Sequence, residues 1–378
     1  MLKNLLFCAF LCFCIAFLCT QVCALDISAK NAVLIECESG DIIFSKNAFS
    51  RASMASTTKI MTAIVAIEKG NLDKVIEISC DAIGIEGSSI YLKEGEQLTL
   101  RELLFALLLE SANDAAIAIA LAVGGSVENF VQMMNDKVCE LSLENTHFTN
   151  PHGLDNENHY TTAYDLAQIA RYAMQNPCFC EVVSSKKQII PSLDGERVLI
   201  NHNKLLKSYD GAIGIKTGFT KKSGRCLVSC AERDGVKLIA VTLNAPSDWN
   251  DHTLMLDLGF DKYEHLSLAE AGDYILRLHC VGAKKDEINC GNLSSLGITL
   301  KKGDAERIVA SFEGQRFLYA PIKQGECVGK IVYSLDGRRI ASLDIYALES
   351  ASAIQNKKSI FERIFKRHGK DQTSKIFH

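Results

Sequence analysis

The sequence predicts an α+β protein in two parts, a mixed domain followed by a small all-β domain. Its 378 residues are 48% hydrophobic and only 23% charged, which is enough to bury two cores. Strand-like runs stand at both ends of a helical middle between about residues 30 and 260, as expected for one antiparallel sheet covered by helices. After Tyr263 only short alternating runs with glycine turns remain.

The first 24 residues have the pattern of a secretory signal peptide. Lys3 precedes an apolar run from Leu5 to Cys19, and Val22–Ala24 offers small residues for cleavage before Leu25. An uncleaved membrane anchor is the alternative, although the run is short for a span of about 20 residues. Either interpretation places the body of the chain outside the cytoplasm.

Net charge and cysteine spacing argue against nucleic acid and metal as partners, and we expect no cofactor. The formal net charge of −4 does not suit a nucleic-acid-binding surface over the whole molecule. Five of the fifteen cysteines lie in the leader, and the others lack the spacing of a zinc site. We therefore expect no metal ligands and interpret the remaining cysteines mainly as buried free thiols.

The first domain, expected over residues 25–262, begins with a hairpin and a buried helix. The runs Ala32–Ile35 and Asp41–Phe44 flank a turn, which predicts two antiparallel strands. The helix is expected to start at Ser53 as a capping residue and to stop at Gly70. Its near-continuous apolarity predicts that all its faces are covered.

Two more helices follow, with a polar break between them. Thr99–Glu102 is a capping box that opens an apolar helix, Leu103–Leu109, and a third helix is expected over Asp114–Val123. Ser111 and Asn113 fall at the break, where their side chains can face a cleft. Simple helix capping by either residue is the alternative.

Three late strands are expected to complete the sheet. Ala212–Gly218 is the first, and Cys226–Ala231 and Val236–Leu243 flank a hairpin turn at Arg233–Gly235. We expect them to pair with the N-terminal hairpin, with helices on both faces and a helical subdomain beside the sheet.

The second domain, expected over residues 263–347, has no cluster of nucleophile, base and acid, so we expect a spacer or interaction role. Its predicted strands are Tyr274–Leu278, Ile298–Leu300, Ile308–Phe312, Cys327–Val332 and Arg339–Tyr346. In the tail, residues 348–378, apolar residues at helical spacing from Ile360 to Phe365 lie among lysines and arginines. This pattern suits either a short amphipathic helix on an anionic membrane surface or a solvated tail, and the sequence leaves both open.

Three motifs carry the candidate chemistry: Ser56-Thr57-Thr58-Lys59, Ser111-Ala112-Asn113 and Lys216-Thr217-Gly218. Each is weak alone, because Ser184–Lys187 and Ser45–Asn47 repeat the first two patterns. The segment at Ser184 leads into a strand-like, proline-stopped run, so its serine and lysine would not share a helical face. Order and context therefore select the first set.

Together the motifs predict acyl transfer through a serine ester. Ser56 is the candidate nucleophile, and Lys59, one helical turn later, is the candidate base. Burial and nearby Lys216 should lower the pKa of Lys59. Ser111 is suited to pass a proton to the leaving amine, and the Asn113 amide to hold a substrate peptide group.

The remaining groups are expected to bind substrate. Lys216 and Thr217 offer a charge and a hydroxyl to a substrate carboxylate, and Gly218 lets a peptide lie against the strand edge. The backbone N–H groups of Ser56 and Phe219 are candidate oxyanion donors, the first at a helix N-terminus.

These residues resemble the low-molecular-weight penicillin-binding proteins that are D-alanyl-D-alanine carboxypeptidases of the S11 peptidase type. The resemblance covers roughly residues 30 to 260, with a similar small β domain after it. Besides the motifs, it is carried by Ala55–Thr62, Thr146–Leu154, Tyr160–Ala167 and Asn203–Leu206.

The resemblance implies the fold of the β-lactamase and penicillin-binding-protein transpeptidase domain, and it implies a reaction. Ser56 would attack a peptidoglycan stem peptide ending in D-Ala-D-Ala, release the terminal D-Ala, and yield an acyl-enzyme that water hydrolyses. β-Lactams would trap Ser56 as covalent inhibitors. The resemblance also implies a place at the outer face of the bacterial cytoplasmic membrane and a cleft shaped by Thr146–Asp165. We interpret His152 in that segment as a structural histidine, because a histidine in such a place is more often structural than catalytic.

Three alternatives remain on sequence grounds. A class A-like β-lactamase needs a glutamate for its deacylating water, and the nearest, Glu140 and Glu144, are interpreted as solvent-facing charges. A non-catalytic β-lactam-binding sensor or wall-binding protein is disfavoured because all the expected active groups are present. Transpeptidase or endopeptidase action shares the same acyl-enzyme, and the sequence does not name the acceptor.

Overall fold

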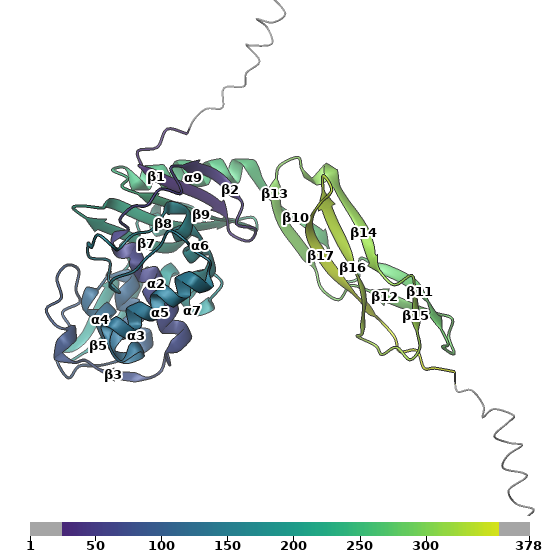
Figure 1. Ribbon diagram of the computed structural model, residues 1–378, viewed down its shortest axis with the longest axis horizontal. Coiled ribbons are helices and arrows are strands. Elements are labelled where there is room, and N and C mark those ends of the chain that lie inside the picture. The colour runs from purple at the N-terminus through teal and green to yellow at the C-terminus, as the bar shows by residue number, and fades with distance from the viewer. Residues whose placement is uncertain (1–24, 355–378) are drawn as a thin grey trace, which may run out of the picture. The chain divides into compact units, whose positions relative to one another are not determined.

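The computed structural model describes residues 25–354, which divide into two compact units after Lys262 (Figure 1). The expected leader and the basic part of the tail, from Lys357 on, lie outside the described residues. Within the described part of the chain, no single helix is long and apolar enough to cross a membrane, and one bent helix pair is so only when taken together.

A five-stranded antiparallel sheet, in the order β2-β1-β9-β8-β7, forms the centre of the first unit. The expected pairing of the N-terminal hairpin with the late strands is confirmed, because β1 lies directly against β9. Asp234 and Gly235 form the expected turn, with φ angles of 47° and 80°. The strands are β1 (Asn31–Glu36), β2 (Ile42–Lys46), β7 (Ala212–Thr220), β8 (Gly224–Arg233) and β9 (Val236–Leu243).

Helices cover the sheet, and others form a helical subdomain beside it (Figure 1). Both α6 (Ala163–Ala173) and α9 (Asp248–Lys262) pack on β9, which is buried along nearly its whole length. A strand buried in this way needs cover on both faces. The other helices are α2 (Lys59–Lys69), α3 (Leu100–Leu109), α4 (Asn113–Gly124), α5 (Val127–Glu140), α7 (Pro177–Ser184) and α8 (Leu205–Ser208).

The helix ends follow the predicted signals in two places. The capping box of Thr99 and Glu102 is formed at the start of α3, and Gly70 ends α2. Short elements complete the unit: the hairpins β3 (Val75–Glu77) with β4 (Gln97–Thr99) and β5 (Lys187–Ser192) with β6 (Gly195–Ile200), and the 3₁₀ turn η2 (Cys80–Ala82).

The predicted start of the first helix was wrong. A 3₁₀ turn, η1 (Ala55–Thr58), precedes α2, and no serine side chain caps either element. Instead the hydroxyls of Thr57 and Thr58 donate to the carbonyl oxygens of Met54 and Ala55, at 2.6 and 2.8 Å. Such short-range bonds from threonine compete with the regular helical ladder, which explains the tighter turn.

The second unit is all β, as predicted. Its six-stranded sheet has the order β14-β16-β17-β12-β11-β15, and β10 pairs with β13 separately. Buried side chains of Ile331, Leu343 and Ile345 lie in its core. The strands are β10 (Tyr263–Ala269), β11 (Ile275–Val281), β12 (Glu287–Gly291), β13 (Leu296–Lys301), β14 (Ile308–Gly314), β15 (Phe317–Tyr319), β16 (Cys327–Leu335) and β17 (Arg338–Ala347), with the turn η3 (Ala305–Arg307).

All ten cysteines among the described residues are free thiols. The prediction that they are buried holds for five: Cys37, Cys226, Cys230, Cys280 and Cys290. Cys80, Cys139 and Cys327 are exposed instead, and they lie in the turn η2, near the end of α5 and at the start of β16.

Candidate active site

Ser56 and Lys59 face each other across the turn η1, which packs against β7 and β8. The distance between Lys59 Nζ and Ser56 Oγ is 3.1 Å. A 3₁₀ turn has three residues per turn, so side chains at i and i+3 are eclipsed and lie closer than on an α-helix. The two side chains are close together, as predicted, but a 3₁₀ turn brings them together instead of an α-helix.

The amine of Lys59 is buried and held by three partners. Besides Ser56, Nζ lies 2.6 Å from Asn113 Oδ1 and 2.6 Å from the His152 carbonyl oxygen. Burial lowers the pKa of Lys59 well below its usual value, and the positive charge of Lys216 lowers it further. Asp114 partly offsets this pKa shift. The site therefore favours the neutral amine, the form that can accept a proton.

The serine-asparagine motif lies at the junction of α3 and α4. Ser111 is buried, with a left-handed φ of 60° that is uncommon for a residue with a side chain. Ala112 is the residue that precedes α4, and no side-chain capping bond is formed there. The capping alternative for Ser111 and Asn113 was therefore wrong.

The Asn113 amide is largely committed to the protein. Its Oδ1 accepts from Lys59, its Nδ2 donates to the Glu86 carbonyl oxygen at 2.5 Å, and its backbone N–H donates to Ser88. One lone pair and one hydrogen of the amide remain for a substrate. Asn113 therefore has a second role beside the expected contact with substrate: it holds the Lys59 amine in place.

The lysine-threonine-glycine motif lies on the edge strand β7. Lys216 is 1% exposed, and its Nζ donates to the Thr217 carbonyl oxygen at 2.9 Å. Burial lowers the pKa of Lys216 to about 7, against an opposing effect of Glu110. A methyl group on Gly218 would lie 3.1 Å from the Ser56 nitrogen, so glycine is what lets this strand approach the turn so closely. The ring of Phe219 is exposed.

Sequence reasoning missed the contribution of the His152 backbone. The ring of His152 makes a hydrogen bond within its own turn: its Nδ1 accepts from the Leu154 N–H at 3.2 Å, and burial, followed by the nearby Lys59, lowers its pKa to about 4. The carbonyl oxygen, however, holds Lys59. The Asn150 side chain shapes this turn by accepting the N–H of Gly153 at 2.7 Å. An asparagine before Pro-His-Gly was the only signal for such a turn.

The competing sequence patterns do not form a site. Ser184 ends α7 and donates to the Cys180 carbonyl oxygen at 2.7 Å, whereas Lys187 opens the next strand. Glu140 is 60% exposed and pairs with Lys137 at 2.7 Å, and Glu144 is exposed. Both glutamates are therefore solvent-facing, as interpreted.

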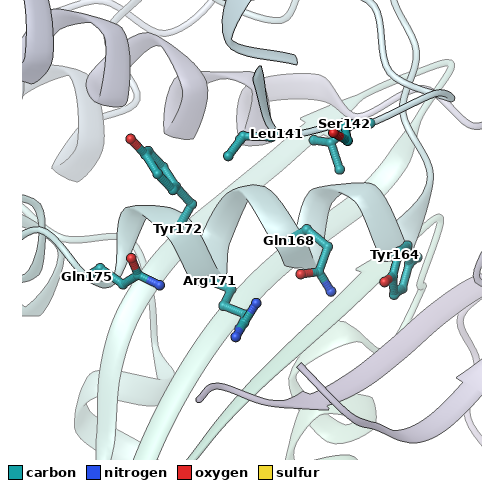
Figure 2. Close-up of a pocket in the computed structure, with 8 residues that line it drawn as sticks. Leu141, Ser142, Tyr164, Gln168, Arg171, Tyr172 and Gln175 are labelled. Carbon is teal, nitrogen blue, oxygen red and sulfur yellow. The ribbon is translucent and has the colours of Figure 1, made fainter. Parts of the chain in front are cut away.

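A cavity of about 250 Å³ lies against α6 (Figure 2). Its polar side chains serve the fold: Arg171 donates to the Cys37 carbonyl oxygen at 2.7 Å, and the Tyr172 hydroxyl donates to Glu68 at 2.5 Å. The lining consists of Leu141, Ser142, Leu143, Tyr164, Gln168, Arg171, Tyr172 and Gln175. No motif residue lines this cavity, so it is not the catalytic cleft.

Comparison with known proteins decides the family. The family model for D-alanyl-D-alanine carboxypeptidases, peptidase family S11, matches residues 19–247. The chain belongs to the S11 peptidases. The model for the C-terminal domain of penicillin-binding protein 5 matches residues 263–352 of this S11 peptidase, which agrees with its all-β second unit.

Relatives resemble this S11 peptidase over most of its length. The D-alanyl-D-alanine carboxypeptidase DacF of Bacillus subtilis is 34% identical over 356 residues, which are 91% of this chain and 90% of the relative. Penicillin-binding protein 5 of Haemophilus influenzae aligns with a TM-score of 0.68 and 30% identity, over 86% of this chain and 98% of that structure. A variant of the Streptomyces K15 DD-transpeptidase aligns with a TM-score of 0.60 and 34% identity, over 62% and 99%. The predicted family, fold class and enzyme class are confirmed.

Proposed function

We propose that this S11 peptidase is a D-alanyl-D-alanine carboxypeptidase that removes the terminal D-alanine from peptidoglycan stem peptides through an acyl-enzyme on Ser56. The observation that carries the proposal is the buried Lys59 amine, 3.1 Å from Ser56 Oγ and held by Asn113 and His152. Family membership supplies the substrate class.

The hydrogen-bond partners of Lys59 explain how it acts as a base. A neutral amine has two hydrogens and one lone pair. Asn113 Oδ1 and the His152 carbonyl oxygen are acceptors only, so they take the two hydrogens. The lone pair is then directed at Ser56, whose hydroxyl donates to it. As Ser56 Oγ attacks the carbonyl of the penultimate D-alanine, its proton passes to Lys59.

The charge that develops on the substrate oxygen needs donors. The backbone N–H of Ser56 on η1 and that of Phe219 on β7 are the proposed pair, and the close approach of Gly218 to the Ser56 nitrogen brings the two segments together. Ser111 is the proposed carrier of the proton from Lys59 to the leaving D-alanine. A serine hydroxyl can accept and donate a proton at once, as such a transfer requires.

The carboxylate of the departing D-alanine is proposed to bind at Lys216 and Thr217. Because the pKa of Lys216 is about 7, the arrival of a carboxylate beside it would favour the ammonium form. The same site would accept the carboxylate of a β-lactam, and acylation of Ser56 by β-lactams is part of the proposal.

The acyl acceptor defines the second candidate function. The similarity of the chain to the Streptomyces K15 DD-transpeptidase favours transfer to an amine in place of hydrolysis. A peptide ending in D-Ala-D-Ala, incubated with and without glycine as an amine acceptor, separates the two. If the enzyme is a carboxypeptidase, the main product of both reactions should be the substrate peptide shortened by one D-alanine. A main product in which glycine has replaced the terminal D-alanine would favour transpeptidation.

Location and membrane contact are also proposals. The leader pattern of residues 1–24 supports export, and the apolar residues among cations between Ile360 and Phe365 support contact with an anionic membrane surface. Cell fractionation of the full chain and of a variant ending at residue 354 tests both. We expect the shortened chain to be released into the soluble extracytoplasmic fraction. If the full and shortened chains are retained on the membrane to the same extent, the tail does not mediate membrane contact.

The nucleophile is tested with Ser56→Ala and, as a matched control, Ser184→Ala from the competing motif. Release of D-alanine and labelling by a fluorescent penicillin are measured on the purified proteins. Ser56→Ala should lose both, while Ser184→Ala should match the unaltered enzyme. Labelling that persists in Ser56→Ala would show a different nucleophile, and an unaltered enzyme that is labelled but releases no D-alanine would favour a sensor.

A further inference from the structure

A buried histidine outside the three motifs is connected to the nucleophile turn by hydrogen bonds. His159 Nε2 lies 2.8 Å from the Thr58 hydroxyl, and that hydroxyl donates to the Ala55 carbonyl oxygen at 2.8 Å. His159 is 3% exposed and Thr58 is fully buried. The chain of bonds therefore ends on the residue that immediately precedes Ser56.

The direction of each bond follows from its partners. The backbone N–H of Thr149 donates to His159 Nδ1 at 3.0 Å, so Nδ1 is an acceptor. Burial, together with the nearby His152 and His147, lowers the pKa of His159 to about 3, so the ring is neutral and its one proton lies on Nε2. Nε2–H then donates to Thr58, whose only hydroxyl hydrogen goes to Ala55.

The last bond fixes a peptide group that the reaction uses. The Ala55 carbonyl and the Ser56 N–H belong to one planar, trans peptide unit, so they point in opposite directions. Ala55 has a φ of 48°, a left-handed conformation that alanine rarely adopts without support. A side chain on Gly153 would overlap the Ala55 oxygen, so only glycine at this position leaves room for the carbonyl. Holding the oxygen on one side directs the N–H toward the other.

We propose that His159 is a positioning residue for acylation: through Thr58 it orients the Ala55–Ser56 peptide so that the Ser56 N–H meets the developing oxyanion. The inference rests on the proposed function, because it takes Ser56 as the nucleophile. A hydrogen bond to the carbonyl also polarises the amide and makes its N–H a better donor. His159 itself need not exchange a proton.

A purely structural role makes a different kinetic prediction. His159 also packs against Phe148, with ring centroids 5.7 Å apart, and loss of that packing would lower stability without a specific effect on one step. An oxyanion donor acts mainly in the transition state, so its misorientation lowers the rate of bond formation and leaves ground-state binding almost unchanged.

The test measures acylation of the full chain by a fluorescent penicillin, resolved into the saturating rate constant and the concentration for half-saturation. Thr58→Val and His159→Phe each remove a link while keeping much of the shape, and Thr58→Ser restores the hydroxyl. His147→Gln is the matched control, because His147 lies in the same segment, bonds to the Asn158 carbonyl and has no bond to η1. Thermal unfolding establishes that each variant is folded at the assay temperature.

Removal of a whole oxyanion donor costs about 10²- to 10³-fold, so misorientation should lower the saturating rate constant about tenfold or more. We expect this lower rate constant in Thr58→Val and His159→Phe, with little change in the penicillin concentration for half-saturation. The double variant should be no slower than the slower single variant, because both act through one peptide group. Thr58→Ser and His147→Gln should acylate at the unaltered rate, and the pH profile of folded His159→Phe should keep its shape.

The inference is overturned if folded Thr58→Val acylates at the unaltered rate, if the losses in the double variant multiply, or if only half-saturation changes. A changed pH profile in His159→Phe would assign His159 to proton transfer instead. Failure of the proposed function is distinguishable, because then the unaltered protein would either not be labelled at Ser56 or be labelled without releasing D-alanine.

Discussion

Replacing Lys216 by methionine should stabilise the first unit at neutral pH although it removes a group of the candidate site. Lys216 is 1% exposed, and its Nζ has a backbone carbonyl as a partner. An ammonium group in such a place loses its hydration, which is why its pKa falls to about 7. Methionine has a similar length and no charge, so it fills the same space without that cost.

The size of the stabilisation follows from the difference between the usual lysine pKa of 10.5 and the Lys216 pKa of about 7. At about 1.4 kcal/mol per pH unit, this difference corresponds to a cost of ~5 kcal/mol. The folded state of the unaltered protein binds fewer protons than the unfolded state between pH 7 and 10.5. The cost is therefore absent above pH 10.5, grows as the pH falls to 7, and is constant below that.

The effect is measured by urea unfolding at pH 7 and pH 10 under reducing conditions. The signal is the fluorescence of Trp249, the one tryptophan of the chain, which lies in α9. Lys216→Met should exceed the unaltered protein in unfolding free energy at pH 7 by up to ~4 kcal/mol, and the difference should shrink by ~3 kcal/mol at pH 10. The exposed Lys221→Met is the matched control, with a small difference at both pH values. A Lys216→Met variant that is less stable at pH 7, or a difference that does not depend on pH, would refute the reasoning.

Three further outcomes are expected. Gly218→Ala should slow penicillin acylation about tenfold at nearly unchanged melting temperature, because its methyl group would press on the Ser56 nitrogen; an unaltered rate would contradict the close approach. Asp114→Asn removes a charge that raises the pKa of Lys59, so the acid limb of the acylation pH profile should move to lower pH; movement to higher pH would reverse the assignment. Thr99→Ala should lower the unfolding free energy by about 1 kcal/mol in urea, and no loss would show that the capping box does not stabilise α3.

Most of the fold could be predicted from local patterns. Alternating and apolar runs located all five strands of the first sheet and five of the eight strands of the second unit, but they missed β10, β12 and β15. The signals at Thr99, Gly70 and Asp234–Gly235 marked helix ends and a turn correctly. The start of the first helix was wrong, because the hydroxyls of Thr57 and Thr58 choose backbone partners only when the chain is folded. Propensity alone does not show that choice.

The sequence by itself determined the chemical groups of the site and their family, because reactive side chains must be of particular types and keep a particular order. The tertiary structure decided what surrounds them. It commits the Asn113 amide to Lys59, brings in the carbonyl of His152, and links His159 to the peptide before Ser56. The physical reason is that backbone carbonyls are present in every residue and bonds between distant segments leave no local pattern. Which carbonyl faces which lysine is therefore settled only when the segments pack together.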